Sequence, residues 1–465
     1  MTPAPPSEAA VVRRRRPLVI LLIAHYLSSF GNAVTLVTVP LYVLGVTGSS
    51  FSTGLAGFAN TLPLIFAGAV GGVWIDRVGG KWVSVFCDLL AGVFIGLIPL
   101  LNDTVGLSLP VLMGLLFVRS LGSTPSGAAR QSTIKPLAEL AGVRLESANS
   151  WLQAGPRLGL LIGAPLAGLL AVAAGPVLGM YIDSATFLLS ALLIALALPA
   201  GKIAPGSRQQ GFLRQLTEGV ALVKQIPVIG AMTAFVFVTN LLDDAFAPVI
   251  LPVYSDQVLG GGQYLGWLLA ASGCGAVAGT FLYGPASKRL LTSRRWTLLG
   301  CFAVIGVLRL AFGAELGPVL SIAVSFLLGL AAGPLNPALS TVMLEKVPEA
   351  MRGRVFALTG AVAMSAAPVG ILAAGWAIDG IGLRWTLFVF GTSYLVLVLV
   401  SLRRRALHDM DTPPLPEEPD PGAGTPTTAD AADAADAADT ATTVDTAAGG
   451  PQGTSRGTVK EQARD

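Results

Sequence analysis

Residues 68–81 read GAVGGVWIDRVGGK, a glycine-rich run that leads into three charged side chains. The glycines at its start belong to an apolar segment at 52–75, and a second apolar segment follows at 82–101. Each segment is long enough to cross a bilayer core about 30 Å thick as a helix. We therefore expect a short turn at one face of a membrane, with Asp76 and Arg77 at the water boundary.

The composition of the whole chain agrees with a membrane protein. Of its 465 residues 53% are hydrophobic and only 12% are charged, and the mean hydropathy is +0.70. Windows of about 20 apolar residues, one for each helical crossing, recur between residues 17 and 402. The twelve windows are 18–44, 52–75, 82–101, 108–131, 148–173, 176–199, 228–254, 263–287, 295–313, 317–343, 355–378 and 383–402. The sequence thus predicts an all-α integral membrane protein with twelve transmembrane helices.

Basic residues fall almost entirely on one side of this topology. With twelve crossings, 26 of the 30 Lys and Arg residues lie on the side of the N-terminus and only Arg384 lies on the other side, while Arg119, Arg157 and Arg309 fall within helices. Cytoplasmic loops are enriched in Lys and Arg, so both termini are expected to be cytoplasmic. The expected location is the cell (inner or plasma) membrane.

Charge and composition also divide the chain. Residues 1–402 carry a net charge of +9, whereas 403–465 carry −6 and almost no large apolar side chains. We expect a basic N-terminus at 1–16, a six-helix bundle at 17–199, an amphipathic cytoplasmic linker at 200–227, a second bundle at 228–402 and a disordered acidic cytoplasmic tail at 403–465.

The two predicted bundles repeat one another at a spacing close to 210 residues. GAVGG at 68–72 recurs as GAVAG at 275–279, and Pro40-Leu41-Tyr42 recurs as Pro252-Val253-Tyr254. At the same offset Asn32 corresponds to Asp244. A duplicated six-helix unit predicts two pseudo-symmetric bundles around a central cavity, which is an architecture for transport by alternating access.

Several function classes are excluded by what the sequence lacks. Two histidines, His25 and His408, and three scattered cysteines do not make a zinc, haem or iron–sulfur site of normal ligand number. Neither Gly-Lys pair is followed by Ser or Thr, so the phosphate-binding loop of an ATP-driven pump is absent. We expect no enzymatic activity, no metal or other cofactor and no nucleic-acid partner.

The turn after the second window resembles the signature loop of the major facilitator superfamily. Its matching residues are Gly72, Asp76, Arg77, Gly79 and Lys81. The resemblance implies that the loop is a latch between the two bundles on the cytoplasmic side, in which Asp76 contacts the other bundle. At the equivalent position of the second half the Asp-Arg pair is replaced by Tyr283 and Gly284, so no charged latch is expected there.

The fifth window resembles the antiporter motif of the exporters of that superfamily. Its small residues and proline are Gly159, Gly163, Pro165 and Gly168, which we expect to form a smooth face for close helix packing. Segments 45–49, 183–190 and 352–355 look like the macrolide-efflux and enterobactin-exporter branch. The resemblance implies export of drugs, siderophores or other metabolites in exchange for protons.

Charged side chains inside membrane helices are costly and are therefore candidates for function. Arg119 resembles the arginine of drug/proton antiporters, and a cation there would stabilise a carboxylate or bind an anionic substrate. Asp243 and Asp244 lie past the middle of the seventh window, and Asp244 is the preferred proton carrier because Asn32 is its counterpart. Asp183 and Arg309 are expected to reach water from the outer ends of their helices.

The sequence favours a monomeric secondary transporter that exports a lipophilic small molecule by proton antiport. Three alternatives remain open at this stage: uptake or uniport of a metabolite, a sensor that does not transport, and a lipid translocator. Asn32, Arg119, Asp243 and Asp244 are the candidate residues of the cavity and of proton coupling.

Overall fold

The computed structural model describes residues 15–198, 227–289, 293–347 and 352–403. The predicted linker at 200–227 and acidic tail at 403–465 lie outside these ranges, apart from Pro227 and Arg403, and so does the N-terminus up to residue 14. Within the described ranges every regular element is a helix, as the sequence predicts.

Six helices form the first bundle. They are α1 (Arg16–Thr47), α2 (Ser50–Val78), α3 (Gly80–Thr104), α4 (Leu109–Ala141), α5 (Leu145–Ala174) and α6 (Pro176–Ala197). Local chemistry sets several of their ends: proline stands in the first turn of α1, α4 and α6, where no amide hydrogen bond is lost. Ser49 caps α2 by accepting a hydrogen bond from the Ser52 amide, just after Gly48 ends α1 in the left-handed conformation.

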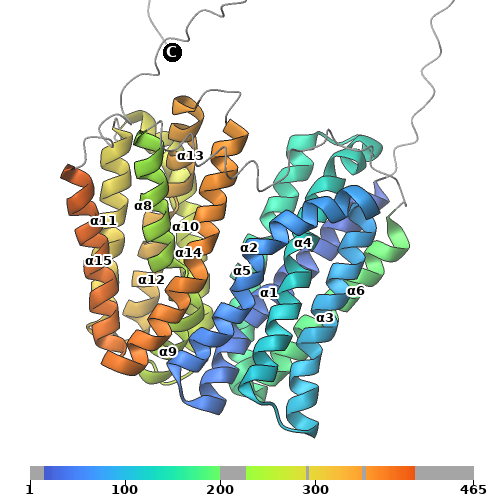
Figure 1. The fold of residues 1–465 in the computed structure, drawn as a ribbon, viewed down its shortest axis with the longest axis horizontal. Coiled ribbons are helices and arrows are strands. Elements are labelled where there is room, and N and C mark those ends of the chain that lie inside the picture. The colour runs from blue at the N-terminus through green and yellow to red at the C-terminus, as the bar shows by residue number, and fades with distance from the viewer. Residues whose placement is uncertain (1–14, 199–226, 290–292, 348–351, 404–465) are drawn as a thin grey trace, which may run out of the picture. The chain divides into compact units, whose positions relative to one another are not determined.

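Nine helical segments of the described residues form the second bundle, which lies beside the first in Figure 1. They are α8 (Pro227–Asp243), η1 (Phe246–Ile250), α9 (Leu251–Gln257), α10 (Gln263–Arg289), α11 (Arg294–Phe312), α12 (Pro318–Ala332), α13 (Leu335–Lys346), α14 (Arg352–Ile381) and α15 (Leu383–Arg403). Each of the twelve predicted windows coincides with one helix or with a run of consecutive helical segments.

Two of the predicted crossings are interrupted, and prolines explain both breaks. The seventh crossing changes to a π-helix at η1, which contains Pro248; this residue donates no amide hydrogen bond and its ring crowds the preceding turn. The tenth crossing breaks between α12 and α13 at Gly333-Pro334. These breaks place irregular backbone inside the bundle, where side chains of neighbouring helices surround it.

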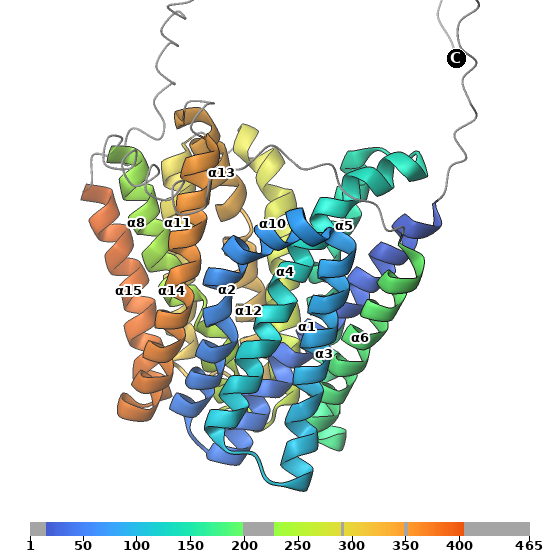
Figure 2. The ribbon, with the colours of Figure 1, turned by 45° about the vertical axis from the view of Figure 1, so that its right-hand side comes forward.

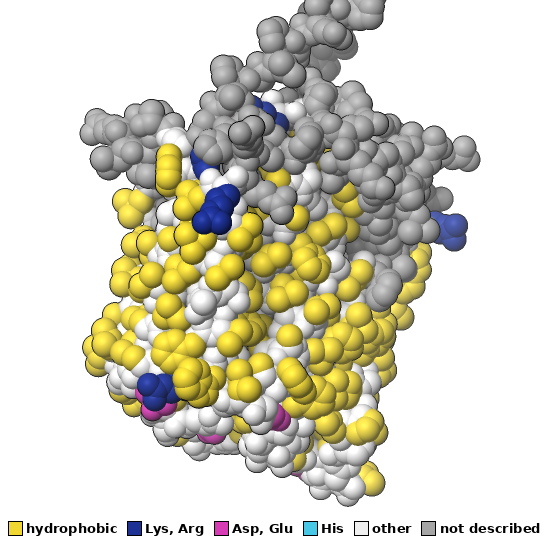
Figure 3. Space-filling view, turned by 60° about the vertical axis from the view of Figure 1, so that its left-hand side comes forward, with side chains coloured by type: hydrophobic (Ala, Val, Ile, Leu, Met, Phe, Trp, Pro, Cys, Tyr) yellow, Lys and Arg dark blue, Asp and Glu magenta, His cyan; other side chains and the backbone are white. Residues whose placement is uncertain are grey.

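Ten helical stretches of the described residues are long and apolar enough to cross a membrane. Neither α2 nor α4 is among them, and α4 falls short because it carries several polar side chains. These polar side chains of α4 are Arg119, Ser120, Ser123, Thr124, Ser126 and Arg130. In Figure 3 apolar side chains cover the middle of the molecular face, and the visible charged side chains lie near the ends of the helices, as a bilayer requires.

The predicted internal repeat is visible in the packing of two tyrosines. Tyr42 of α1 donates a hydrogen bond of 2.6 Å to Asn102 near the end of α3, the third helix of the first bundle. Its counterpart Tyr254 of α9 donates to the Leu316 carbonyl, 3.1 Å away, just after α11, the third crossing of the second bundle. The two halves therefore repeat a contact as well as a sequence motif.

The start of α1 and the end of α15 lie at the same end of the helices, which we call the inner end (Figure 2). At the opposite, outer end the two bundles meet along two seams, α2 against α14 and α5 against α10. Alternation of the helices puts the start of α2, the end of α14, the end of α5 and the start of α10 at this outer end.

Candidate functional site

A buried ion pair joins α4 to α6 in the first bundle. Arg119 Nη2 lies 2.9 Å from Asp183 Oδ2, and the two side chains are 4% and 0% exposed. Thr35 of α1 donates a second hydrogen bond, 2.5 Å long, to the same carboxylate oxygen. The prediction that Asp183 reaches water from its helix end is wrong, because a cation on a neighbouring helix compensates its charge inside the bundle.

Arg119 also contacts two amide side chains beside the cavity. Its Nη2 donates to Asn32 Oδ1 at 2.7 Å, and its Nη1 donates to Asn60 Oδ1 at 3.4 Å. Two buried polar atoms of the cluster have no hydrogen-bond partner among the described residues, Arg119 Nε and Asp183 Oδ1. Such unpaired groups are costly and mark a site whose bonding is incomplete in this conformation.

Two cavities meet at Asn32, which is itself exposed. A cavity of about 120 Å³ lies on its outer side and is lined by Asn60, Arg119 and Pro248 of η1, among others. A larger one of about 410 Å³ lies on its inner side, with His25, Arg130 and Leu160 in its wall. The Arg119 cluster thus forms part of the wall of the outer of these two cavities.

A second buried network lies closer to the inner end. Arg130 pairs with Asp88 of α3 and donates to Ser28 of α1 and to Ser190 of α6. Arg130 Nη1 also lies 3.2 Å from His25 Nδ1, while His25 Nε2 lies 2.9 Å from a carbonyl of α5. A carbonyl only accepts, so Nε2 carries the proton and Nδ1 accepts from Arg130, an arrangement in which the histidine is fully bonded. This network fastens five helices of the first bundle.

The second bundle contains its own ion pair. Arg309 of α11 lies 2.5 Å from Asp243 Oδ1 and packs against the rings of Phe246 and Tyr394. The expectation that Arg309 reaches water is wrong, because its side chain is only 4% exposed and the aspartate and two rings replace water around it. Asp244, by contrast, is exposed, so the adjacent carboxylates point in different directions as residues about 100° apart on a helix must.

A carboxylate bridges the two bundles at the outer end. Asp379, near the end of α14, accepts hydrogen bonds from the backbone amides of Ser50 and Phe51 at 2.9 and 3.0 Å, and from the Ser49 hydroxyl at 2.8 Å. The positive end of α2 thereby receives a negative charge from the other bundle. The sequence analysis missed this contact, although the exposed amides after Gly48 are the local signal for such an acceptor.

The residues of the antiporter motif lie where α5 packs against its neighbours. Added Cβ atoms at Gly159 and Gly163 would meet the backbone of α1 at 2.6 Å and 3.1 Å. Gly168 lies against the backbone of Gln263 at the start of α10 in the same way, and Gly266 of α10 lies against the backbone of α5 around Pro165. These glycines allow two backbones to approach closely both within the first bundle and across the outer seam.

The latch motif lies at the inner end, where α2 passes into α3. Gly79 adopts a φ of 90°, which favours glycine, and Lys81 donates to the Leu198 carbonyl at the end of α6, 2.6 Å away. Asp76 and Arg77 are exposed, and no hydrogen bond or ion pair is found for either among the described residues. The side chains of 66–73, which include Gly72, lie outside the description. Among the described residues, the contacts between the bundles therefore gather at the outer end, and the hydrogen bond of Lys81 stays within the first bundle.

Two helical bundles that meet at one end and enclose polar cavities define a membrane transport protein. A family model described as Major Facilitator Superfamily matches residues 21–260 and 233–432, and the chain belongs to that family. The family expected from the latch and antiporter motifs is thus confirmed.

The chain is similar in sequence to known efflux proteins over most of its length. It is 29% identical over 405 residues to the multidrug efflux pump Tap of Mycolicibacterium fortuitum, covering 86% of this chain and 98% of that protein. It is 30% identical over 410 residues to Tap of Mycobacterium tuberculosis, with 86% and 96% covered. Macrolide efflux protein A of Streptococcus pyogenes is 23% identical over 416 residues, with 82% and 96% covered.

The fold is also found among solved structures. The nucleoside transporter NupG superposes with a TM-score of 0.69 at 14% sequence identity, covering 83% of this chain and 98% of that one. A bacterial homologue of the iron transporter ferroportin, in an inward-facing state, gives a TM-score of 0.61 at 17% identity, with 84% and 99% covered. At these identities the likeness concerns the fold alone.

Proposed function

We propose that the protein exports lipophilic small molecules from the cell in exchange for protons, with both termini in the cytoplasm. Family membership and the efflux proteins that it resembles support the direction of transport. The basic residues assigned to one side by the topology support the orientation. Under this orientation the inner end is cytoplasmic.

The observation that carries the coupling proposal is the Arg119–Asp183 pair beside the cavity. Asp183 Oδ1 has no hydrogen-bond partner among the residues that the structure describes, so a proton added to this oxygen breaks no bond seen there. Protonation removes the negative charge that compensates Arg119 and leaves an uncompensated guanidinium at the cavity wall, where it already donates to Asn32. Proton release restores the pair. The uncompensated guanidinium of the protonated state repels a cationic cargo such as ethidium, so proton binding and cargo binding exclude one another, as exchange requires.

The seams between the bundles support alternating access. The outer end is held by Asp379 and by the close packing of Gly168 and Gly266, which describes a transporter closed to the outside. In the opposite state the outer seam opens and the inner ends approach, which would bring Asp76 to the second bundle. Closure at one end at a time is the minimal requirement for a carrier.

Expression in a bacterial host tests the function directly. Cells that make the protein are expected to accumulate several-fold less ethidium than cells with an empty vector, and an uncoupler should restore accumulation. Equal accumulation with ethidium, a macrolide and a tetracycline in both strains would contradict the export proposal.

Asp244 tests the role of the second bundle. It is exposed, so Asp244→Asn is expected to fold normally but to lower proton-driven export about tenfold, because we propose this carboxylate as a second proton carrier in addition to Asp183. Ethidium transport should be measured in inverted vesicles with an imposed pH gradient. Asp256→Asn, an exposed change of the same kind on α9, serves as the control. Unchanged gradient-driven transport in Asp244→Asn would remove Asp244 from the mechanism.

A further inference from the structure

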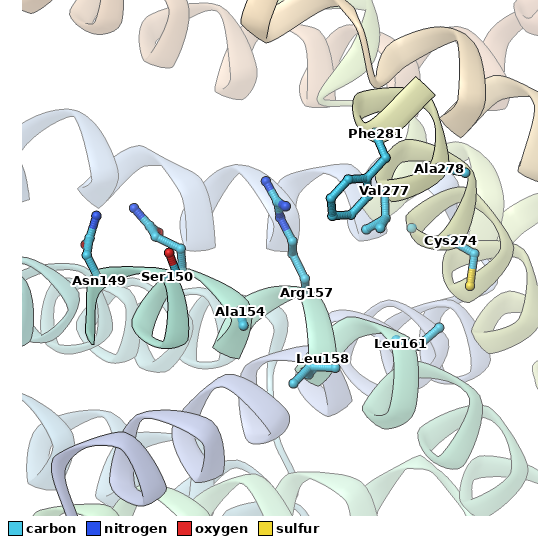
Figure 4. A pocket seen from close by; sticks show the side chains of 12 residues that line it. Asn149, Ser150, Ala154, Arg157, Leu158, Leu161, Cys274, Val277, Ala278 and Phe281 are labelled. Carbon is cyan, nitrogen blue, oxygen red and sulfur yellow. The ribbon is translucent and has the colours of Figure 1, made fainter. Parts of the chain in front are cut away.

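A groove of about 730 Å³ separates the inner halves of α5 and α10 (Figure 4). It is within the size range of pockets that hold drug-sized ligands. Towards the outer end the groove closes where Gly273 of α10 meets Leu160 of α5, because a Cβ added at Gly273 would lie 3.4 Å from Leu160. The groove is therefore a wedge in the seam between the bundles, closed at its outer end.

The groove lies on a different side of α5 from the inner of the two cavities that share Asn32. Pro156 and Leu160 face the cavity that contains His25 and Asn32. Leu158 lies two residues from each, which is about 200° around the helix, and it lines the groove instead. It is 42% exposed, so the groove extends towards the surface that the bilayer covers.

Polar and apolar lining residues are separated along the groove. Asn149, Ser150 and Gln153 line the part nearest the inner end, about 12–18 Å along the helix from Leu161. Beyond Arg157 the lining is apolar, and Phe281 is 75% exposed to the groove and its surroundings. This order of polar head and apolar body matches an amphiphile in the inner leaflet.

Arg157 is the charged group at the boundary between these two parts. Its side chain is exposed, and Figure 4 shows it rising from α5 into the space beside Phe281. Arg119, Arg130 and Arg309 each pair with an aspartate in their bundle. For Arg157 no ion pair or hydrogen bond is found within the described ranges. A cation inside a membrane helix without a protein partner is a functional candidate whose missing partner is an anion.

We propose that this groove is an access site for amphiphilic cargo from the inner leaflet and that Arg157 binds the carboxylate or phosphate of that cargo. The inference rests on the proposed export function and names the substrate class. The guanidinium holds the anionic group in a charge-assisted hydrogen bond, while Leu158, Leu161 and Phe281 cover the apolar body. Arginine suits this role because its planar fork matches a carboxylate or a phosphate.

Binding to the purified protein in phosphatidylcholine nanodiscs tests the proposal. Dansyl-labelled undecanoic acid is the probe, and its methyl ester is the uncharged reference. Arg157→Gln is expected to weaken binding of the acid about tenfold and to leave binding of the ester unchanged. Arg157→Lys should keep most of the affinity. Arg144→Gln, which removes an exposed cation that precedes α5, should have no effect. Equal loss for acid and ester, or no loss for either, would overturn the proposal.

Cys274 lines the groove and is exposed, so it reports occupancy at the site itself. In a Cys87→Ala/Cys301→Ala background the acid is expected to slow alkylation of Cys274 by N-ethylmaleimide, and Arg157→Gln should abolish this protection. If nanodiscs of phosphatidylglycerol protect Cys274 without the probe and cancel its effect, the site holds a resident lipid and not cargo, which overturns the proposal.

Export of the cation ethidium by the wild-type protein tests the export function separately from the proposal for the groove. A wild-type protein that exports no compound would contradict the export function, while the binding measurements would still decide whether the groove takes an anionic amphiphile.

Discussion

Asp183→Asn is expected to abolish proton-driven export and to destabilise the protein. The amide keeps the shape of the carboxylate but leaves Arg119 as an uncompensated cation whose side chain is 4% exposed. Removing one partner of a buried ion pair costs about 3–5 kcal/mol, so the loss should be visible as a lower melting temperature of the purified protein. Export is lost because the group proposed to bind the proton is gone.

A double variant separates the two effects. Arg119→Gln/Asp183→Asn removes both charges, so it should recover much of the stability that the single variant loses, since no unpaired charge remains in the bundle. It should not recover export. Asp256→Asn, at an exposed position on α9, should change neither quantity. Recovery of gradient-driven ethidium transport by the double variant would mean that the pair is structural only.

Much of the fold could be predicted from the sequence because membrane topology is encoded locally. Each crossing needs its own apolar window, and the basic residues of the loops identify the side. The two breaks were not predicted, although Pro248 and Pro334 stand in the sequence at those points. Proline is common in membrane helices, so its presence alone does not separate a continuous helix from an interrupted one.

The candidate site was predicted less completely because its contacts join distant residues. Arg119 and Asn32 were expected at the cavity, and the structure joins them in a hydrogen bond. The pairing of Arg119 with Asp183 depends on which faces of α4 and α6 meet, and neither hydropathy nor spacing determines that rotation. Asp379 and Ser49 are separated by 330 residues, so the bridge at the outer end could be found only from the assembled bundles.

The outer seam between α5 and α10 is expected to be the most sensitive conformational element. A Cβ at Gly266 would lie 2.7 Å from the Pro165 Cα and 2.8 Å from the Ala164 carbonyl carbon, and backbone atoms do not move aside as the end of a side chain does. Gly266→Ala therefore opposes closure of the outer end and favours the state in which the inner ends approach. Overpacking of about 1–3 kcal/mol corresponds to a shift of about 5- to 150-fold in this equilibrium.

Cys274 measures this shift, because it lies in the groove that the inner ends would close. In the Cys87→Ala/Cys301→Ala background, Gly266→Ala should slow its alkylation by N-ethylmaleimide about tenfold and lower ethidium export. Gly273→Ala is the matched control, since its added Cβ would lie 3.4 Å from Leu160, an ordinary contact with a side chain. It should be alkylated at the rate of the parent. Equal alkylation rates in both variants would show that close packing at Gly266 does not set the balance between the two states. Closure of the outer end would then depend on Asp379 and on the packing of α2 against α14.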